Sequence, residues 1–181
     1  MSHAQDSTPV ASEVDVSLDR DEFLRMLVQK LAGTLESVIG LDEAAGFVSI
    51  VGQEVGAELD RSYRNEMRVD LLDGHQVADV LVDLKRRIRG DFRVTYQDEE
   101  RIELANRACP FGDRVVGHPS MCMMTSNVFG SIAAQNLGYA KVVLGDTIAM
   151  GAAGCSVVVH TMHTPAAEAA RGREYFASEA D

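Results

Sequence analysis

Hydrophobic positions follow a helical period through the first half of the chain. Apolar residues recur at steps of three and four over residues 23–39, with Asp19 placed to cap the start and Gly40 to end the helix. The same spacing returns over residues 41–59 and 74–90. The pattern therefore predicts three amphipathic helices in succession.

The second predicted helix carries Gly52 and Gly56 on one side. A glycine inside a helix costs about 1 kcal/mol relative to alanine, so this side is expected to be approached closely by another element or a ligand. Close packing of another helix is the ordinary explanation.

The period changes to two after residue 91. Apolar and polar residues alternate over residues 92–97 and again over 102–106, with a charged turn between them, which is typical of a half-buried hairpin. A fourth helix is expected from Ser126 to a C-terminal glycine at Gly138. Residues 141–148 and 155–160 then predict two further strands.

This order of three helices, a hairpin, a helix and a hairpin (ααα-ββ-α-ββ) predicts an α+β fold. Its mainly antiparallel sheet of about four strands would be packed by the N-terminal helices. The chain has 181 residues, 46% of them hydrophobic, which is enough for one good core. We expect a disordered leader over residues 1–18, a single domain over 19–164 and a tail over 165–181. After Pro165 the chain is alanine- and charge-rich and is expected to form a short helix or a tail.

The negative net charge of the chain argues against some classes of binding partner. The net charge is -11 and the pI about 4.8, so the chain lacks the basic face needed to bind nucleic acid directly. The cationic cluster Lys85-Arg86-Arg87 is interpreted as favourable charge at a helix C-terminus. No apolar run approaches a membrane span and no secretion signal is evident, so a cytoplasmic protein that does not bind membranes is expected.

The three cysteines are the strongest candidates for chemistry. An odd number of cysteines without an export signal argues against a disulfide framework. Cys109 follows the first hairpin, Cys122 lies just before the fourth helix and Cys155 begins the last strand, and folding would make the strands next to Cys109 and Cys155 neighbours. These thiols would bind a metal with a fourth ligand, for which His118 is the leading candidate; the others are His160, His163 and Asp146. Ordinary buried cysteines are the alternative.

Two stretches resemble a known family. The first is Asn106-Arg107-Ala108-Cys109-Pro110-Phe111-Gly112, and the second runs from Pro119 to Gly130 around Cys122. Together with a closing segment through Cys155, they are similar to the methanogen output domain, a small sensory or output module of signalling proteins. Its cysteine positions are similar to those of the iron–sulfur-binding regions of helix-turn-helix repressors, which implies Cys109, Cys122 and Cys155 as ligands.

The leading hypothesis is thus a non-enzymatic regulatory domain. Its three cysteines would bind an iron–sulfur cluster, of 4Fe-4S type, and report redox state, iron supply or a gas. A structural zinc beside a pocket for a small apolar ligand is the alternative, and the architecture of 4-vinyl-reductase-type sensing domains is an analogy for it. A cysteine enzyme using Cys122 with His118 or His160 is a third reading, which no recognisable catalytic motif supports.

The chain has no effector motif of its own. Its signal would therefore pass to an unidentified signalling protein or through self-association. The length of the first amphipathic helix favours a homodimer, or another homo-oligomer, formed through the N-terminal helices.

Overall fold

The computed structural model describes residues 18–177, so the predicted leader lies outside the described residues except for Leu18. The helices are α1 (Arg20–Ile39), α2 (Leu41–Met67), α3 (Gly74–Arg87), α4 (Ser120–Leu137) and α5 (Pro165–Ala169). The strands are β1 (Arg93–Gln97), β2 (Arg101–Asn106), β3 (Tyr139–Leu144), β4 (Cys155–His160) and β5 (Arg173–Phe176). Two 3-10 turns are also present, η2 (Gly112–Val115) and η3 (Ile148–Met150).

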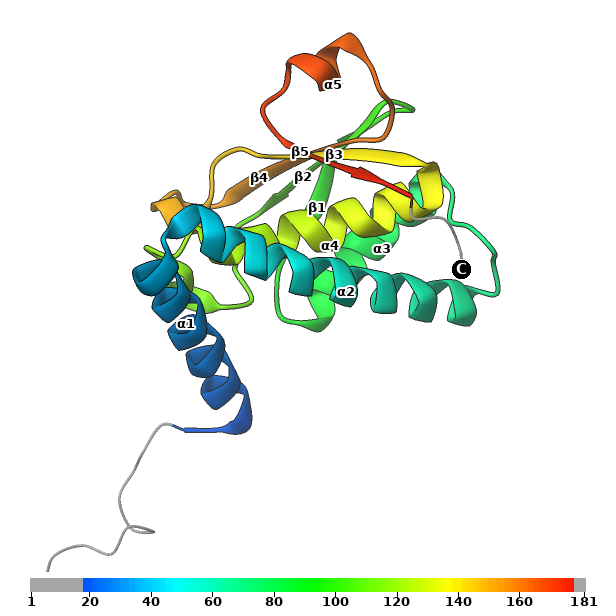
Figure 1. Ribbon diagram of the computed structural model, residues 1–181. Helices are drawn as coiled ribbons and strands as arrows, with labels where there is room; N and C mark the ends of the chain where they lie inside the picture. The colour runs from blue at the N-terminus through cyan, green and yellow to red at the C-terminus, as the bar shows by residue number, and fades with distance from the viewer. Residues whose placement is uncertain (1–17, 178–181) are drawn as a thin grey trace, which may run out of the picture.

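The strands form one antiparallel sheet in the order β1-β2-β4-β3-β5. Figure 1 shows α4 lying between this sheet and α2, whereas α5 lies on the opposite side of the sheet. The predicted α+β class is confirmed. So is the pairing of the two strands next to Cys109 and Cys155, since Asn106 of β2 is opposite Cys155 of β4.

Local sequence signals explain both ends of α1 and the start of α3. The Asp19 side chain accepts a hydrogen bond from the Glu22 backbone N–H, and Gly40 ends α1 with a positive φ. Asp73 and Gln76 form a reciprocal capping box at the start of α3. The ends of α1 and the start of α3 are as predicted, whereas α2 runs to Met67 instead of residue 59 and α3 ends at Arg87 instead of residue 90.

The two glycines of α2 let it approach α4 closely. A Cβ atom on Gly52 would lie 2.7 Å from the Cβ of Asn127, and one on Gly56 would lie 2.9 Å from the Cβ of Ser131. Any side chain at either position would push the two helices apart. Helix packing, and not a ligand, is therefore the reason for this glycine pair.

Two further predicted boundaries were wrong. The fourth helix begins at Ser120, six residues before the predicted cap at Ser126, because Ser120, Met121 and Ser126 are all buried against the rest of the domain. The segment assigned to a tail contributes α5 and the edge strand β5, which pairs with β3. Tyr175 of β5 is 5% exposed and belongs to the core, so burial of this aromatic ring stabilises the fifth strand.

The core lies between α3, α4 and the inner face of the sheet. Phe129 of α4 is fully buried and packs edge-on against Phe92 with 5.5 Å between ring centroids. α4 is apolar around most of its circumference, as expected for a helix enclosed by other elements. Over residues 18–177, no helix has the length and apolar character required to cross a bilayer.

Candidate functional site

All three cysteines of the chain line one cavity at the end of the sheet. Cys109 follows β2, Cys122 lies in the first turn of α4 and Cys155 is the first residue of β4. The cavity has a volume of about 30 Å³, room for about two water molecules. Its remaining lining is mostly apolar and includes Phe92, Phe111, Val115, Met121, Leu144 and Val157. The fold thus collects thiols from three separate segments.

Polar groups lie beside the sulfur atoms, and one of them donates a hydrogen bond. The backbone N–H of Ile148 donates to Cys155 Sγ at 3.4 Å, and the backbone N–H of Phe111 offsets part of the rise that burial causes in the pKa of Cys109. The Thr147 hydroxyl offsets part of the rise that burial causes in the pKa of Cys122, and its oxygen is buried without a hydrogen-bond partner among residues 18–177. Donors of this kind stabilise thiolate ligands and tune the potentials of metal clusters.

Burial nevertheless keeps the thiols of Cys109 and Cys122 protonated in the metal-free protein. It raises the pKa of Cys122 to about 11, with the neighbouring cysteines adding to the effect, and burial also raises the pKa of Cys109. A nucleophilic cysteine needs the opposite shift. A bound cation would deprotonate the thiols outright.

A buried lysine lies behind the cavity wall. Lys85 of α3 is 5% exposed, and its Nζ donates to Oγ1 of Thr125, a cavity-lining residue, at 2.8 Å. The ammonium also lies 5.7 Å and 5.3 Å from the ring centroids of Phe92 and Phe129. Burial lowers the pKa of Lys85 to about 8, and the charges that oppose this shift are those of the three cysteines. No carboxylate of residues 18–177 neutralises it.

Sequence reasoning missed Lys85 because it was read together with its cationic neighbours. Arg86 and Arg87 are exposed and pair with Asp83. Lys85 instead follows the buried Leu81 by four residues, on the face of α3 that enters the core. This four-residue spacing from a buried leucine was the sequence signal that could have indicated a buried Lys85.

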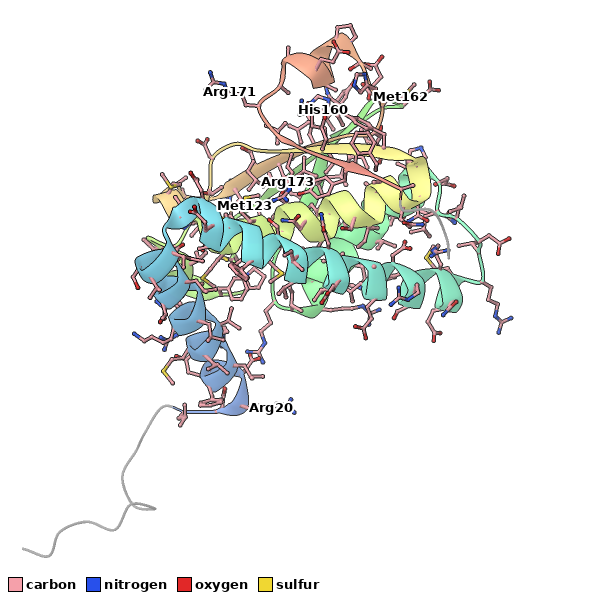
Figure 2. All side chains as sticks on the ribbon, viewed as in Figure 1. Arg20, Met123, His160, Met162, Arg171 and Arg173 are labelled. Atoms are coloured by element: carbon pink, nitrogen blue, oxygen red, sulfur yellow. The ribbon has the colours of Figure 1, made fainter. Side chains whose placement is uncertain are left out.

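The structure does not bring the predicted fourth ligand to the thiols. His118 is absent from the cavity lining, and its Nδ1 lies 2.9 Å from Glu36 Oε2 on α1. His160 lies on the α5 side of the sheet (Figure 2), and His163 pairs with Glu168. Asp146 is likewise absent from the lining.

The sulfur atoms are not arranged around a single ion. Among residues 18–177, no three side chains of His, Cys, Asp or Glu are placed so that they could hold one metal ion together. The donor set is therefore three thiols that face one cavity without meeting at a point.

A family model extends over this whole arrangement. The model of methanogen output domain 1 matches residues 27–160, a range that includes all three cysteines and Lys85. The chain belongs to this family. The methanogen output domain is accordingly a small regulatory module, as the sequence motifs indicated.

A solved structure shares the fold of this output domain. Trafficking protein particle complex subunit 3 from Naegleria fowleri, covalently bound to palmitic acid, is similar with a TM-score of 0.63 and 12% sequence identity. The likeness covers 87% of this chain and 98% of that one. No curated protein matches this chain.

Proposed function

We propose that this output domain is a regulatory sensor that binds an iron–sulfur cluster in its three-cysteine cavity. The observation that carries the proposal is that every cysteine of the chain lines the same cavity, from three segments far apart in sequence. Cysteines buried only as small hydrophobes have no reason to gather at one place. Three ligands leave one iron open to exchange, which suits a sensor.

Charge supports a metal centre with thiolate ligands. Three thiolates exceed a doubly charged metal centre by one negative charge, and the ammonium of Lys85 supplies one positive charge close by. An ammonium buried without a counter-ion destabilises the metal-free fold. The arrangement is thus complete only when an anionic centre occupies the cavity.

The spacing of the thiols favours a cluster over zinc. A tetrahedral zinc requires all its sulfur ligands at about 2.3 Å from one ion, and no such grouping exists over the described residues. In a cluster, each thiolate binds a different iron. The cavity of about 30 Å³ must widen to take it, and the wall from Cys109 to Val115 is made of loop and a 3-10 turn.

Side chains of this wall and of the segment just after it bond to α1. A structural change at the cavity could therefore reach the exposed helix α1. Arg114 of η2 donates from Nε to Glu22 Oε1 at 3.0 Å, and His118 pairs with Glu36. Movement of the wall on cluster binding would therefore be transmitted to α1. In this scheme His118 is a positioning residue and not a ligand.

Anaerobic reconstitution with ferrous iron and sulfide tests the proposal. The wild type should gain iron, acid-labile sulfide and broad visible absorption, and Cys109→Ser, Cys122→Ser and Cys155→Ser should each lose most of all three signals. Lys85→Met should retain less cluster than the wild type, whereas Lys141→Met, which removes an equally buried lysine away from the cavity, should not. Failure of the wild type to take up iron would reject the cluster; stoichiometric zinc in its place would select the zinc alternative.

A second candidate is acylation of a cavity cysteine. It is favoured by the apolar lining and by the fold shared with a protein that carries covalently bound palmitic acid. Because burial raises the pKa of Cys109 and Cys122, the thiol would first have to lose its proton; the thiolate would then attack an activated acyl thioester, forming a new thioester and releasing the donor's thiol. Intact-mass measurement of the purified protein, before and after hydroxylamine, would reveal an acyl adduct and its removal.

A further inference from the structure

The outer faces of α1 and α2 leave an unusually large apolar surface. Eleven large apolar side chains of α1 and of residues 41–55 in α2 are 37–74% exposed. Together they leave on the order of 1,000 Å² of apolar surface in water, whereas monomers seldom expose contiguous patches beyond a few hundred Å². A stable homodimer buries roughly 800 Å² on each partner. The surface is thus large enough for a dimer interface.

The spacing on α1 is that of a helix packed along another helix. Leu24, Val28, Leu31, Leu35 and Val38 follow one another at alternating steps of four and three. This is the a/d repeat of interlocking helices. Within the described domain four of these five side chains are exposed, Leu31 and Val38 by 58% and 74%, and only Leu35 is half-buried.

Charges on the two helices are complementary. The acidic side chains of α1 are paired with cations of the domain: Asp21, whose side chain is 50% exposed, with Arg89, Glu22 with Arg114 and Glu36 with His118. The other exposed charged residues of α1, Arg20 and Lys30, are both positive. The exposed charges over the first five turns of α2 are all negative: Asp42, Glu43, Glu54 and Glu58.

We infer that these faces bind a second copy of this chain, with α1 of one copy packed on α2 of the other. In a two-fold dimer each contact occurs twice, so both basic α1 faces meet acidic α2 faces while the apolar side chains of both helices are buried. Packing α1 on α1 would instead oppose like charges. An anionic lipid surface is disfavoured by the acidic α2 face and the net charge of -11.

Met162 provides a control site for substitutions in the proposed interface. Figure 2 shows Arg20 at the free end of α1 and Met162 beside α5, on the other side of the sheet. Met162 is 49% exposed, close to the 58% and 57% of Leu31 and Ile50. A charge introduced at Met162 therefore changes an equally exposed apolar site outside the proposed interface.

Sedimentation equilibrium of the full chain is the first test. The wild type and Met162→Glu should be dimers at micromolar concentration, whereas Leu31→Glu and Ile50→Glu should be folded monomers by mass and circular dichroism. A monomeric wild type, whether or not it binds lipid vesicles, would overturn the inference. So would dimers that persist in both helix variants.

A charge exchange tests the pairing of α1 with α2. Lys30→Glu and Glu54→Lys should each raise the dimer dissociation constant several-fold, and an equimolar mixture of the two variants should recover near wild-type association. The wild-type dissociation constant should also rise with salt. If the mixture associates no better than the separate variants, α1 does not pack on α2. None of these readouts depends on metal in the cavity.

Discussion

Two lysines are almost equally buried on opposite sides of the sheet, and only one of them has a carboxylate partner. Lys141 of β3 is 7% exposed, and its Nζ lies 3.5 Å from Glu174 Oε1. Lys85 is 5% exposed and has a hydroxyl and two aromatic rings beside its ammonium, with three thiols as the nearest ionisable groups. The first lysine is satisfied by the fold itself.

This difference indicates that Lys141 belongs to the scaffold and Lys85 to the functional site. A buried cation normally has an anionic partner because its desolvation is otherwise uncompensated. Lys141 meets that condition within the domain. Lys85 meets it only if an anionic group forms or binds at the cysteines, so we interpret its unpaired charge as part of the site and not of the scaffold.

Substituting each lysine by methionine should give effects of opposite sign. The lowered pKa of Lys85, about 8 instead of 10.5, implies that its charge destabilises the metal-free fold by about 3 kcal/mol at pH 7. Lys85→Met should therefore raise the free energy of unfolding by about 2 kcal/mol, after some loss of packing. Lys141→Met should lower it by up to about 1 kcal/mol. Urea unfolding of both metal-free variants measures the contrast, and destabilisation by Lys85→Met would contradict it.

The stability of the metal-free protein at alkaline pH should show separate contributions from Lys85 and Cys122. The pKa of Lys85 is lowered in the folded state, so metal-free protein should gain stability as pH rises from about 8 toward 10.5. The pKa of Cys122 is raised from 9.0 to about 11, so this group should act in the opposite direction as pH rises through that interval.

Substituting Cys122 or Lys85 alone should separate their opposite effects on stability at alkaline pH. Cys122→Ala should leave the gain from Lys85 more visible, and Lys85→Met should leave the alkaline loss. Unfolding free energies of both variants measured from pH 7 to about pH 11 provide the check. Identical pH profiles for the two variants would show that neither group is perturbed in this way.

The smallest effect is expected at the histidines. His118→Ala removes the hydrogen bond to Glu36 and should lower the free energy of unfolding by about 1 kcal/mol. His163→Ala, a more exposed histidine paired with Glu168, should change it by less than about 0.5 kcal/mol. Iron content after reconstitution should be unchanged in both. Loss of iron only in His118→Ala would restore His118 as a ligand.

Local patterns were sufficient for most of the scaffold. The caps at Asp19 and Asp73 and the hairpin from Arg93 to Asn106 follow from signals within a few residues. The start of α4 was misplaced because Ser126 resembles a cap, although its hydroxyl bonds to Tyr175, a residue far along the chain. The strand β5 was missed because a short segment in a charged region gains its stability from pairing with β3.

The sequence by itself determined the α+β class, the close approach at Gly52 and Gly56, and the identity of the three thiols, because periodicity, glycine cost and side-chain chemistry are local properties. Only the tertiary structure decided what surrounds those thiols. It placed Lys85 behind them and turned His118 toward α1. Burial and charge pairing depend on segments distant in sequence, and no local pattern specifies which of several polar residues will face a cavity.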